Sequence, residues 1–299
     1  MNSNLLKTQI AYQIRRQFKV KTYERLNLIV SFIIAPLLAF LSAFIFRSDI
    51  DLVQNQAYPN FLFFMLISGI FFGLIGSVFE IIKDRSTVQR ERLGGVSLFG
   101  YYVSKYFVLT FFGFIQTILY NIIGMVFLHI PLALVAFNSF VMLLTVIISI
   151  SFGLFISSLT RSTLIASNLI PILIIPQILL GGLIPYANMD KSIYLWETNY
   201  DTAPPIARII PVKYAYEAII TGNVAFTGGN NEINDQISQI VDYLQDNQFM
   251  SIDTQSYVSY LKCPFCSKTW FYDILILIGY ITVTFILGYI IFYRRIFNG

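Results

Sequence analysis

The fold is decided by a stretch in the middle of the chain, residues 132–159, which reads LALVAFNSFVMLLTVIISISFGLFISSL. This stretch contains no Asp, Glu, Lys, Arg or His. A helix of about 20 apolar residues is long enough to cross a hydrocarbon core of about 30 Å. The stretch therefore predicts a transmembrane helix.

Similar uncharged stretches lie on both sides of it. We predict six spans, at residues 26–46, 59–82, 106–128, 132–159, 163–186 and 274–293, with Glu80 in the last turn of the second. Of the 299 residues, 56% are hydrophobic and only 12% are charged, about half of the roughly 25% that is usual in soluble domains. The sequence thus predicts an all-α polytopic membrane protein.

The charges divide unequally between the two sides of these spans. One side carries 14 of the 20 Lys and Arg residues but only 4 of the 16 carboxylates. Because Lys and Arg accumulate on the cytoplasmic side, we expect both termini there, in an integral protein of the plasma (inner) membrane. The net charge of +4 then reflects membrane topology and not nucleic-acid binding.

The same pattern divides the chain into regions. Residues 1–25 precede the first span, and Leu6, Ile10, Ile14 and Phe18 recur in them at every fourth position. That spacing predicts an amphipathic helix at the inner membrane surface, with a solvated basic tail as the alternative. Spans one to five occupy residues 26–186, an extracytoplasmic insertion occupies 187–273, and the sixth span with a cytoplasmic tail occupies 274–299.

Several functions are disfavoured by what the sequence lacks. A secondary transporter or channel is expected to keep ionisable or polar coupling residues within its spans, and the middles of these spans have no Asp, Glu, Lys, Arg or His. The chain contains no Walker A motif, zinc-protease helix, nucleophile elbow or dinucleotide fingerprint. We therefore expect neither enzymatic activity nor a bound cofactor or metal on this chain.

The cytoplasmic segment after the second span is the most charged part of the membrane region. Residues 80–105 read EIIKDRSTVQRERLGGVSLFGYYVSK, and they predict a charged helix, within the segment 83–105, that ends at Gly94 and Gly95. Such a helix suits docking onto a cytoplasmic partner. The alternative is an interfacial loop whose long side chains reach to water.

This segment and a later one carry a resemblance to a known family. Glu80, the run from Arg90 to Arg92, the glycine pair, Ser97 and the Tyr101–Tyr102 pair precede GGLI at 181–184 and IPVKYAYEAI at 210–219. Together they resemble the permeases of ATP-binding-cassette transporters, in particular the G subfamily with the type V exporter fold. The resemblance implies a dimer, with a second copy of the chain as the expected partner.

The resemblance also implies an ATP-driven exporter of a hydrophobic or amphipathic substrate. ATP and Mg would bind a partner nucleotide-binding domain, which is either a separate subunit or a region outside this sequence. The residues implied to couple the permease to that ATPase are Glu80, Arg90, Glu91 and Arg92.

The translocation path is expected between the second and fifth spans of two facing copies. The residues expected to line its cavity are Ile70, Gly73, Pro171 and Ile175. Prolines within a membrane helix are tolerated beside neighbours or a cavity that satisfies the freed backbone groups. Leu183 and Ile184 fall where the family has an apolar gate, and the alternative is that both side chains face lipid.

The sequence contains two cysteines, Cys263 and Cys266, on the predicted outer side. An oxidising compartment favours a disulfide, within one chain or between two. A zinc ion needs four ligands, so two chains would have to share it, and free thiols are the third possibility.

Overall fold

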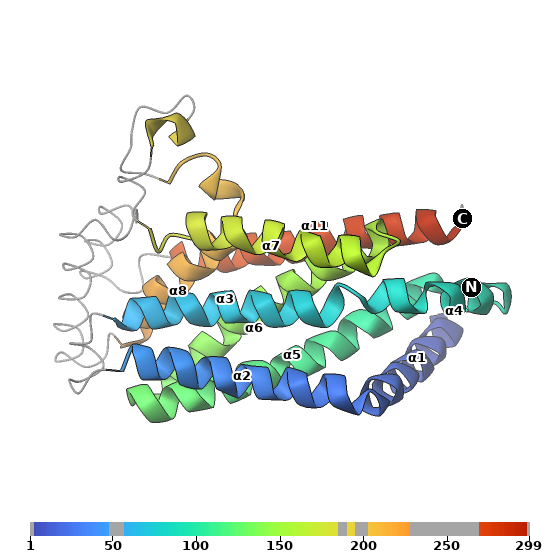
Figure 1. Cartoon of the computed structure of the whole chain (residues 1–299), viewed down its shortest axis with the longest axis horizontal. Coiled ribbons are helices and arrows are strands. Elements are labelled where there is room, and N and C mark those ends of the chain that lie inside the picture. Colours follow the sequence, from blue (N-terminus) through green and yellow to red (C-terminus); the bar gives the residue numbers. More distant parts are fainter. Residues whose placement is uncertain (1–2, 48–56, 185–189, 195–202, 228–268, 298–299) are drawn as a thin grey trace.

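A computed structural model describes residues 3–47, 57–184, 190–194, 203–227 and 269–297 (Figure 1). Within these ranges the chain forms helices and no strand. The longer ones are α1 (Ser3–Tyr23), α2 (Arg25–Ile45), α3 (Tyr58–Ser77), α4 (Glu80–Leu93), α5 (Leu98–Leu128), α6 (Leu132–Leu159), α7 (Thr163–Leu180), α8 (Pro211–Thr227) and α11 (Thr269–Phe297). Two short 3₁₀ helices cover Lys191–Tyr194 and Ala207–Ile209.

Six of these helical stretches are long and apolar enough to cross a membrane. They are α2, α3 with its continuation α4, α5, α6, α7 and α11. The structure therefore confirms the all-α polytopic fold. The helices α1 and α4 and the last turns of α11 lie at one end of the bundle (Figure 1).

The helix boundaries differ from the predicted spans at several ends. α7, predicted to run to residue 186, ends at Leu180. α5 begins at Leu98 and α11 at Thr269, because a helix continues beyond the apolar part that crosses the membrane. The second span ends at Ser77, and Glu80 begins a separate helix, α4. The hydroxyl of Ser157 on α6 accepts hydrogen bonds from the backbone N–H groups of Ile81 and Ile82, at 2.9 and 3.2 Å. It thus satisfies amide donors that the first turn of a helix leaves free.

The centre of the bundle is the contact between α3 and α6, where small residues allow the backbones to approach closely. A Cβ atom added to Gly73 would lie 2.5 Å from the carbonyl oxygen of Val146, and one added to Gly153 would meet Ser77. Small residues at helix contacts are typical of membrane proteins, because packing drives association there. α7 lies at the periphery, with most of its side chains exposed.

The N-terminal helix packs against the bundle through its apolar stripe. The ring of Phe18 contacts the rings of Phe111 and Phe112 on α5, with centroids 5.1 and 5.8 Å apart. Ile10 lies beside Gly100, also on α5. The predicted amphipathic helix is therefore present, but these members of its apolar stripe face α5.

At the other end of the bundle, α8 packs against α3 and α6. Tyr58, Asn138 and Asn223 are buried there, and the Asn138 amide donates to the Tyr58 hydroxyl at 3.2 Å while its oxygen accepts from Asn223 at 3.0 Å. This network joins α3, α6 and α8, so α8 is anchored to the spans.

Candidate functional site

A cluster of buried charges joins three helices at the end of the bundle where α1 and α4 lie. Glu80, the first residue of α4, accepts from the ammonium of Lys21 on α1 at 2.5 Å and from that of Lys105 on α5 at 2.6 Å. Glu80 and Lys105 are both buried. A charge without a partner in such a place is costly, so each group depends on the others.

The cluster continues one turn further along α4. The carboxylate of Asp84 lies 2.9 Å from the ammonium of Lys105 and accepts a hydrogen bond from the Tyr101 hydroxyl, also at 2.9 Å. Lys105 therefore sits between two carboxylates of α4. These contacts join α4 to the second turn of α5.

The far end of α4 is tied to two other helices. Glu91 forms an ion pair with Arg16 of α1. The guanidinium of Arg92 donates to the carbonyl oxygen of Ile296 in the last turn of α11, at 2.8 Å. Two of the three charged residues predicted from the motif thus hold α4 to the bundle.

The side of α4 that faces away from these contacts is exposed. Lys83, Thr87, Arg90 and Leu93 are spaced by three or four residues and all are exposed, with Leu93 89% exposed. Positions three and four apart share one side of a helix. Arg90, the third predicted residue, therefore belongs to an outward face whose tip is an exposed leucine.

Part of this site was not predicted from the motif. Lys21, Lys105 and Asp84 complete the cluster around Glu80, and Leu93 ends the exposed face. Glu80 and Asp84 are four residues apart, and Lys105 follows them next to a predicted span. This pattern could have indicated a cluster of charges. The part played by α1 had no signal in the local sequence, since Lys21 lies 59 positions from Glu80.

The four residues expected to line the substrate cavity lie on different surfaces of this chain. Ile70 is buried, and Gly73 packs against α6. Pro171 and Ile175 are exposed on α7. The structure does not bring the four together within one copy, and their place in a cavity between two copies stays a prediction.

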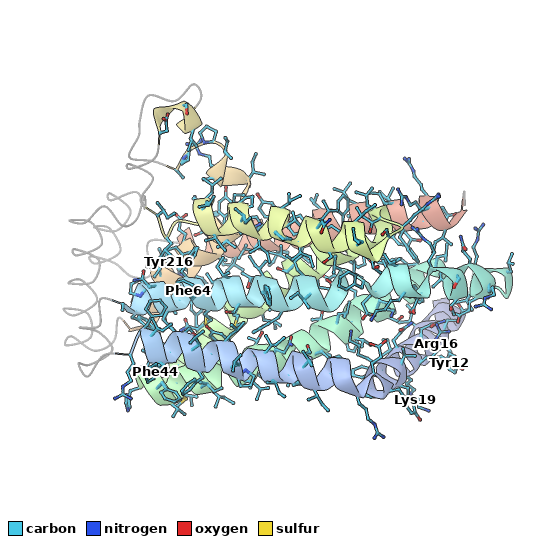
Figure 2. The ribbon with its side chains drawn as sticks, viewed as in Figure 1. Tyr12, Arg16, Lys19, Phe44, Phe64 and Tyr216 are labelled. Carbon is cyan, nitrogen blue, oxygen red and sulfur yellow. The ribbon has the colours of Figure 1, made fainter. Side chains whose placement is uncertain are left out.

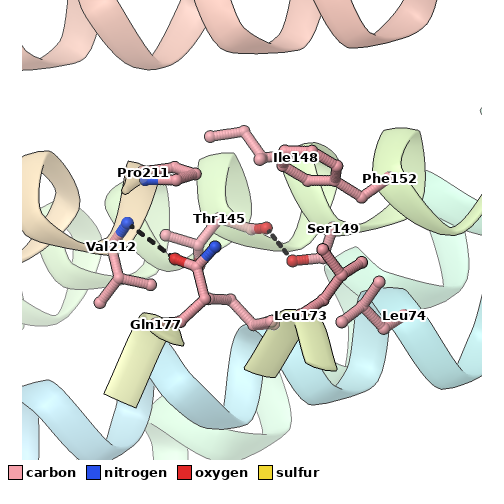
Figure 3. A pocket seen from close by; sticks show the side chains of 10 residues that line it. Leu74, Thr145, Ile148, Ser149, Phe152, Leu173, Gln177, Pro211 and Val212 are labelled. Atoms are coloured by element: carbon pink, nitrogen blue, oxygen red, sulfur yellow. Dashed lines mark hydrogen bonds between the residues drawn. The ribbon is translucent and has the colours of Figure 1, made fainter. Parts of the chain in front are cut away.

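A small, mainly apolar void lies where α7 meets α3, α6 and α8 (Figure 3). Ile70 lines it together with Leu173 and Gln177 of α7. Its volume of about 10 Å³ is close to the roughly 10–15 Å³ that one water needs. The side-chain oxygen of Gln177 accepts from the backbone N–H of Val212 at 3.3 Å, which connects α7 to the first turn of α8.

The expected gate follows directly after α7. A Cβ added to Gly181 would lie 2.8 Å from Phe63 and 2.9 Å from Val212, and Gly182 has a φ of 102°. Both positions therefore require glycine, the first for space and the second for its backbone conformation. Leu183 packs against the core, while Ile184 is exposed. Their role as a gate stays a prediction.

Two further predictions concern metals and disulfides. Cys263 and Cys266 lie outside the described residues, so the structure says nothing about their pairing. Within the described ranges, no group of three or more His, Cys, Asp or Glu residues could hold a metal ion.

The described part of the chain is thus a bundle with six candidate membrane helices and a charged helix held at one end. A model of the family of ABC-2 type transporters matches residues 8–223, which is more than half of the chain. The protein belongs to this family, and it is a permease component of an ABC transporter. No curated protein sequence matches the chain.

Proposed function

We propose that this permease is driven by a separate nucleotide-binding domain and exports a hydrophobic or amphipathic substrate as a homodimer. The observation that supports this most directly is the two-sided character of α4. Its outward face ends in an exposed leucine, and its other side is bonded to the bundle. A helix of this kind can receive force from a soluble motor and pass it to the membrane helices.

The outward face has the composition of a docking surface. Arg90 provides positive charge, and Leu93 provides an apolar anchor beside Gly94 and Gly95. Interfaces commonly combine a few apolar anchors with a polar rim. We assign Arg90 and Leu93 to contact with the ATPase.

The side of α4 that faces the bundle would pass a movement of α4 to the helices it contacts. Glu80 links α4 to α1 and α5, Glu91 links it to α1, and Arg92 links it to α11. A shift of α4 therefore acts on three helices at once. In this proposal ATP and Mg bind the partner domain, and the permease contributes no catalytic residue.

The exposed side of α7 is the surface we assign to the second copy and the path between copies. Pro171, Ile172, Ile175 and Leu179 are exposed on it, and residues 163–180 include no charged side chain. Such a wall would favour apolar or amphipathic molecules. Leu183 and Ile184 would close the path where it meets the outer segment.

Site-specific crosslinking tests the docking surface. A photoreactive amino acid replaces Leu93 in cells, and the same residue replaces Leu132, which is 70% exposed at the start of α6. Irradiation should attach a polypeptide with Walker motifs at position 93 and not at position 132. Equal capture at both positions, or no such polypeptide at position 93, would contradict the proposal.

A further inference from the structure

A cavity of about 290 Å³ lies among α1, α2, α3, α5 and the first turn of α4. It is separate from the exposed side of α7, because no residue of α7 lines it. It reaches the end of the bundle where α1 joins α2 and where α2 and α3 diverge (Figure 1). Its volume is far larger than the roughly 10–15 Å³ that one water needs.

One end of the cavity is charged. Lys21, Glu24, Glu80 and Lys83 line it there. The ammonium of Lys83 lies 3.7 Å from the Glu24 carboxylate, and both side chains are partly exposed. This end therefore offers a cation and an anion side by side, which complements a headgroup that carries both signs of charge.

The remainder of the cavity is mainly apolar. Ile34, Phe71, Phe72, Leu109 and Phe112 contribute to its wall. The amide of Gln116, which also lines it, donates to the backbone and hydroxyl oxygens of Ser31, both at 2.8 Å. The amide donors are thus used within the protein, and the wall suits a hydrocarbon chain.

Two observations place this cavity at a lipid boundary. Val30 on α2 and Ile75 on α3 line it and are exposed, so its edge is apolar and open between these helices. The outer side of α1 carries Tyr12 and Lys19, which point away from the bundle (Figure 2). Tyrosine and basic residues are typical of the headgroup level of a membrane.

We propose that this cavity binds one acyl chain of a zwitterionic glycerophospholipid. The phosphate lies toward Lys83 and Lys21, and the ammonium lies toward Glu24. The acyl chain enters between α2 and α3 and lies against Phe71, Phe72 and Phe112. This inference does not depend on the proposed coupling to an ATPase.

Glycine positions offer a matched pair of variants. Gly76 lines the cavity, and a Cβ added there meets no atom within 4 Å. A Cβ added to Gly279 on α11 also meets no atom within 4 Å, but Gly279 does not line the cavity. Gly76→Leu should therefore fill the cavity without a clash at Cβ, and Gly279→Leu is the control.

Native mass spectrometry of the full chain, released from nanodiscs, measures the bound lipid. The nanodiscs contain equal amounts of phosphatidylethanolamine and phosphatidylglycerol. Wild type and Gly279→Leu should retain phosphatidylethanolamine, and Gly76→Leu should bind it at least about tenfold more weakly, because excluding two methylene groups alone has an effect of that size. Equal retention by Gly76→Leu, no lipid on wild type, or retention of phosphatidylglycerol in preference would overturn the proposal.

A second measurement uses the unmodified protein, so it does not depend on the folding of a variant. Phosphatidylethanolamine with a photoreactive acyl chain is added to wild-type nanodiscs, and the labelled peptides are mapped. Labels should concentrate on the cavity residues of α3 and α5, including Phe71 and Phe112. Labels confined to exposed residues of α11, such as Val283 and Ile286, would contradict the assignment.

Discussion

Single atoms decide how closely α3 can approach its neighbours, and two glycines one turn apart show the contrast. A methyl group at Gly73 would meet the backbone of α6 at 2.5 Å, whereas one at Gly76 would meet nothing within 4 Å. Gly73→Ala should lower the free energy of unfolding by about 1–3 kcal/mol, as overpacking does. Gly76→Ala should change it little. Thermal unfolding of both variants in one detergent would check this, and equal melting temperatures would contradict it.

Glu80 is the residue on which the ionic cluster depends. Glu80→Gln leaves Lys21 without this partner and leaves Lys105 with Asp84 alone. Removing one member of a buried ion pair costs about 3–5 kcal/mol. We expect Glu80→Gln to lower the free energy of unfolding by an amount near the lower end of this range, because Asp84 still pairs with Lys105. The control is Glu217→Gln, which breaks a pair within α8, where about 0.2–0.5 kcal/mol is typical. Similar losses of stability in the two variants would show that the cluster is not a structural junction.

At the scale of elements, α4 has two sides with different expected roles. Glu91→Ala removes the bond to α1 but leaves the outward face intact. The complex with the ATPase should still assemble and hydrolyse ATP, while the response of the ATPase rate to substrate should weaken. Arg90→Ala on the outward face should instead weaken assembly. Pull-down yields and ATPase rates of the two variants measure these effects, and unchanged coupling in Glu91→Ala would favour a passive interfacial helix.

The segment after α7 is the second element with a testable role. Replacing Leu183 and Ile184 together by alanine removes apolar bulk without adding charge. If they form a gate, basal ATPase activity or leak should rise in a protein that folds normally. If they face lipid, transport and basal ATPase activity should stay at the wild-type level, and that result in a folded protein would remove the gate from the account.

Sequence patterns predicted the elements better than the contacts between them. The apolar runs identified six spans, and the glycine pair located the end of α4. The junction between Glu80 and Lys21 could not be predicted, because it depends on how α1 folds back onto α5. The exposure of Pro171 and the burial of Ile70 also follow from helix rotation, which apolar sequences specify weakly when a helix is hydrophobic on all sides.

For the whole molecule, the unequal distribution of charge makes a prediction about orientation. Single cysteines at Thr87 and Asn230, each in a background without Cys263 and Cys266, report on the two sides of the membrane. In sealed cells an impermeant thiol reagent should label position 230 and not position 87, because the side that carries most Lys and Arg residues is expected to be cytoplasmic. Labelling at Thr87 from outside would contradict the predicted topology.

If an ATPase bound at α4 moves this permease, native mass spectrometry of the complex isolated from its own membranes will detect that ATPase. We expect an assembly with two copies of this chain and two copies of a polypeptide that contains Walker motifs. The substitution Leu93→Asp should release that polypeptide, whereas Leu132→Asp should not. A preparation that contains folded permease and no such polypeptide, or one that keeps it unchanged in Leu93→Asp, would show that α4 does not bind the ATPase.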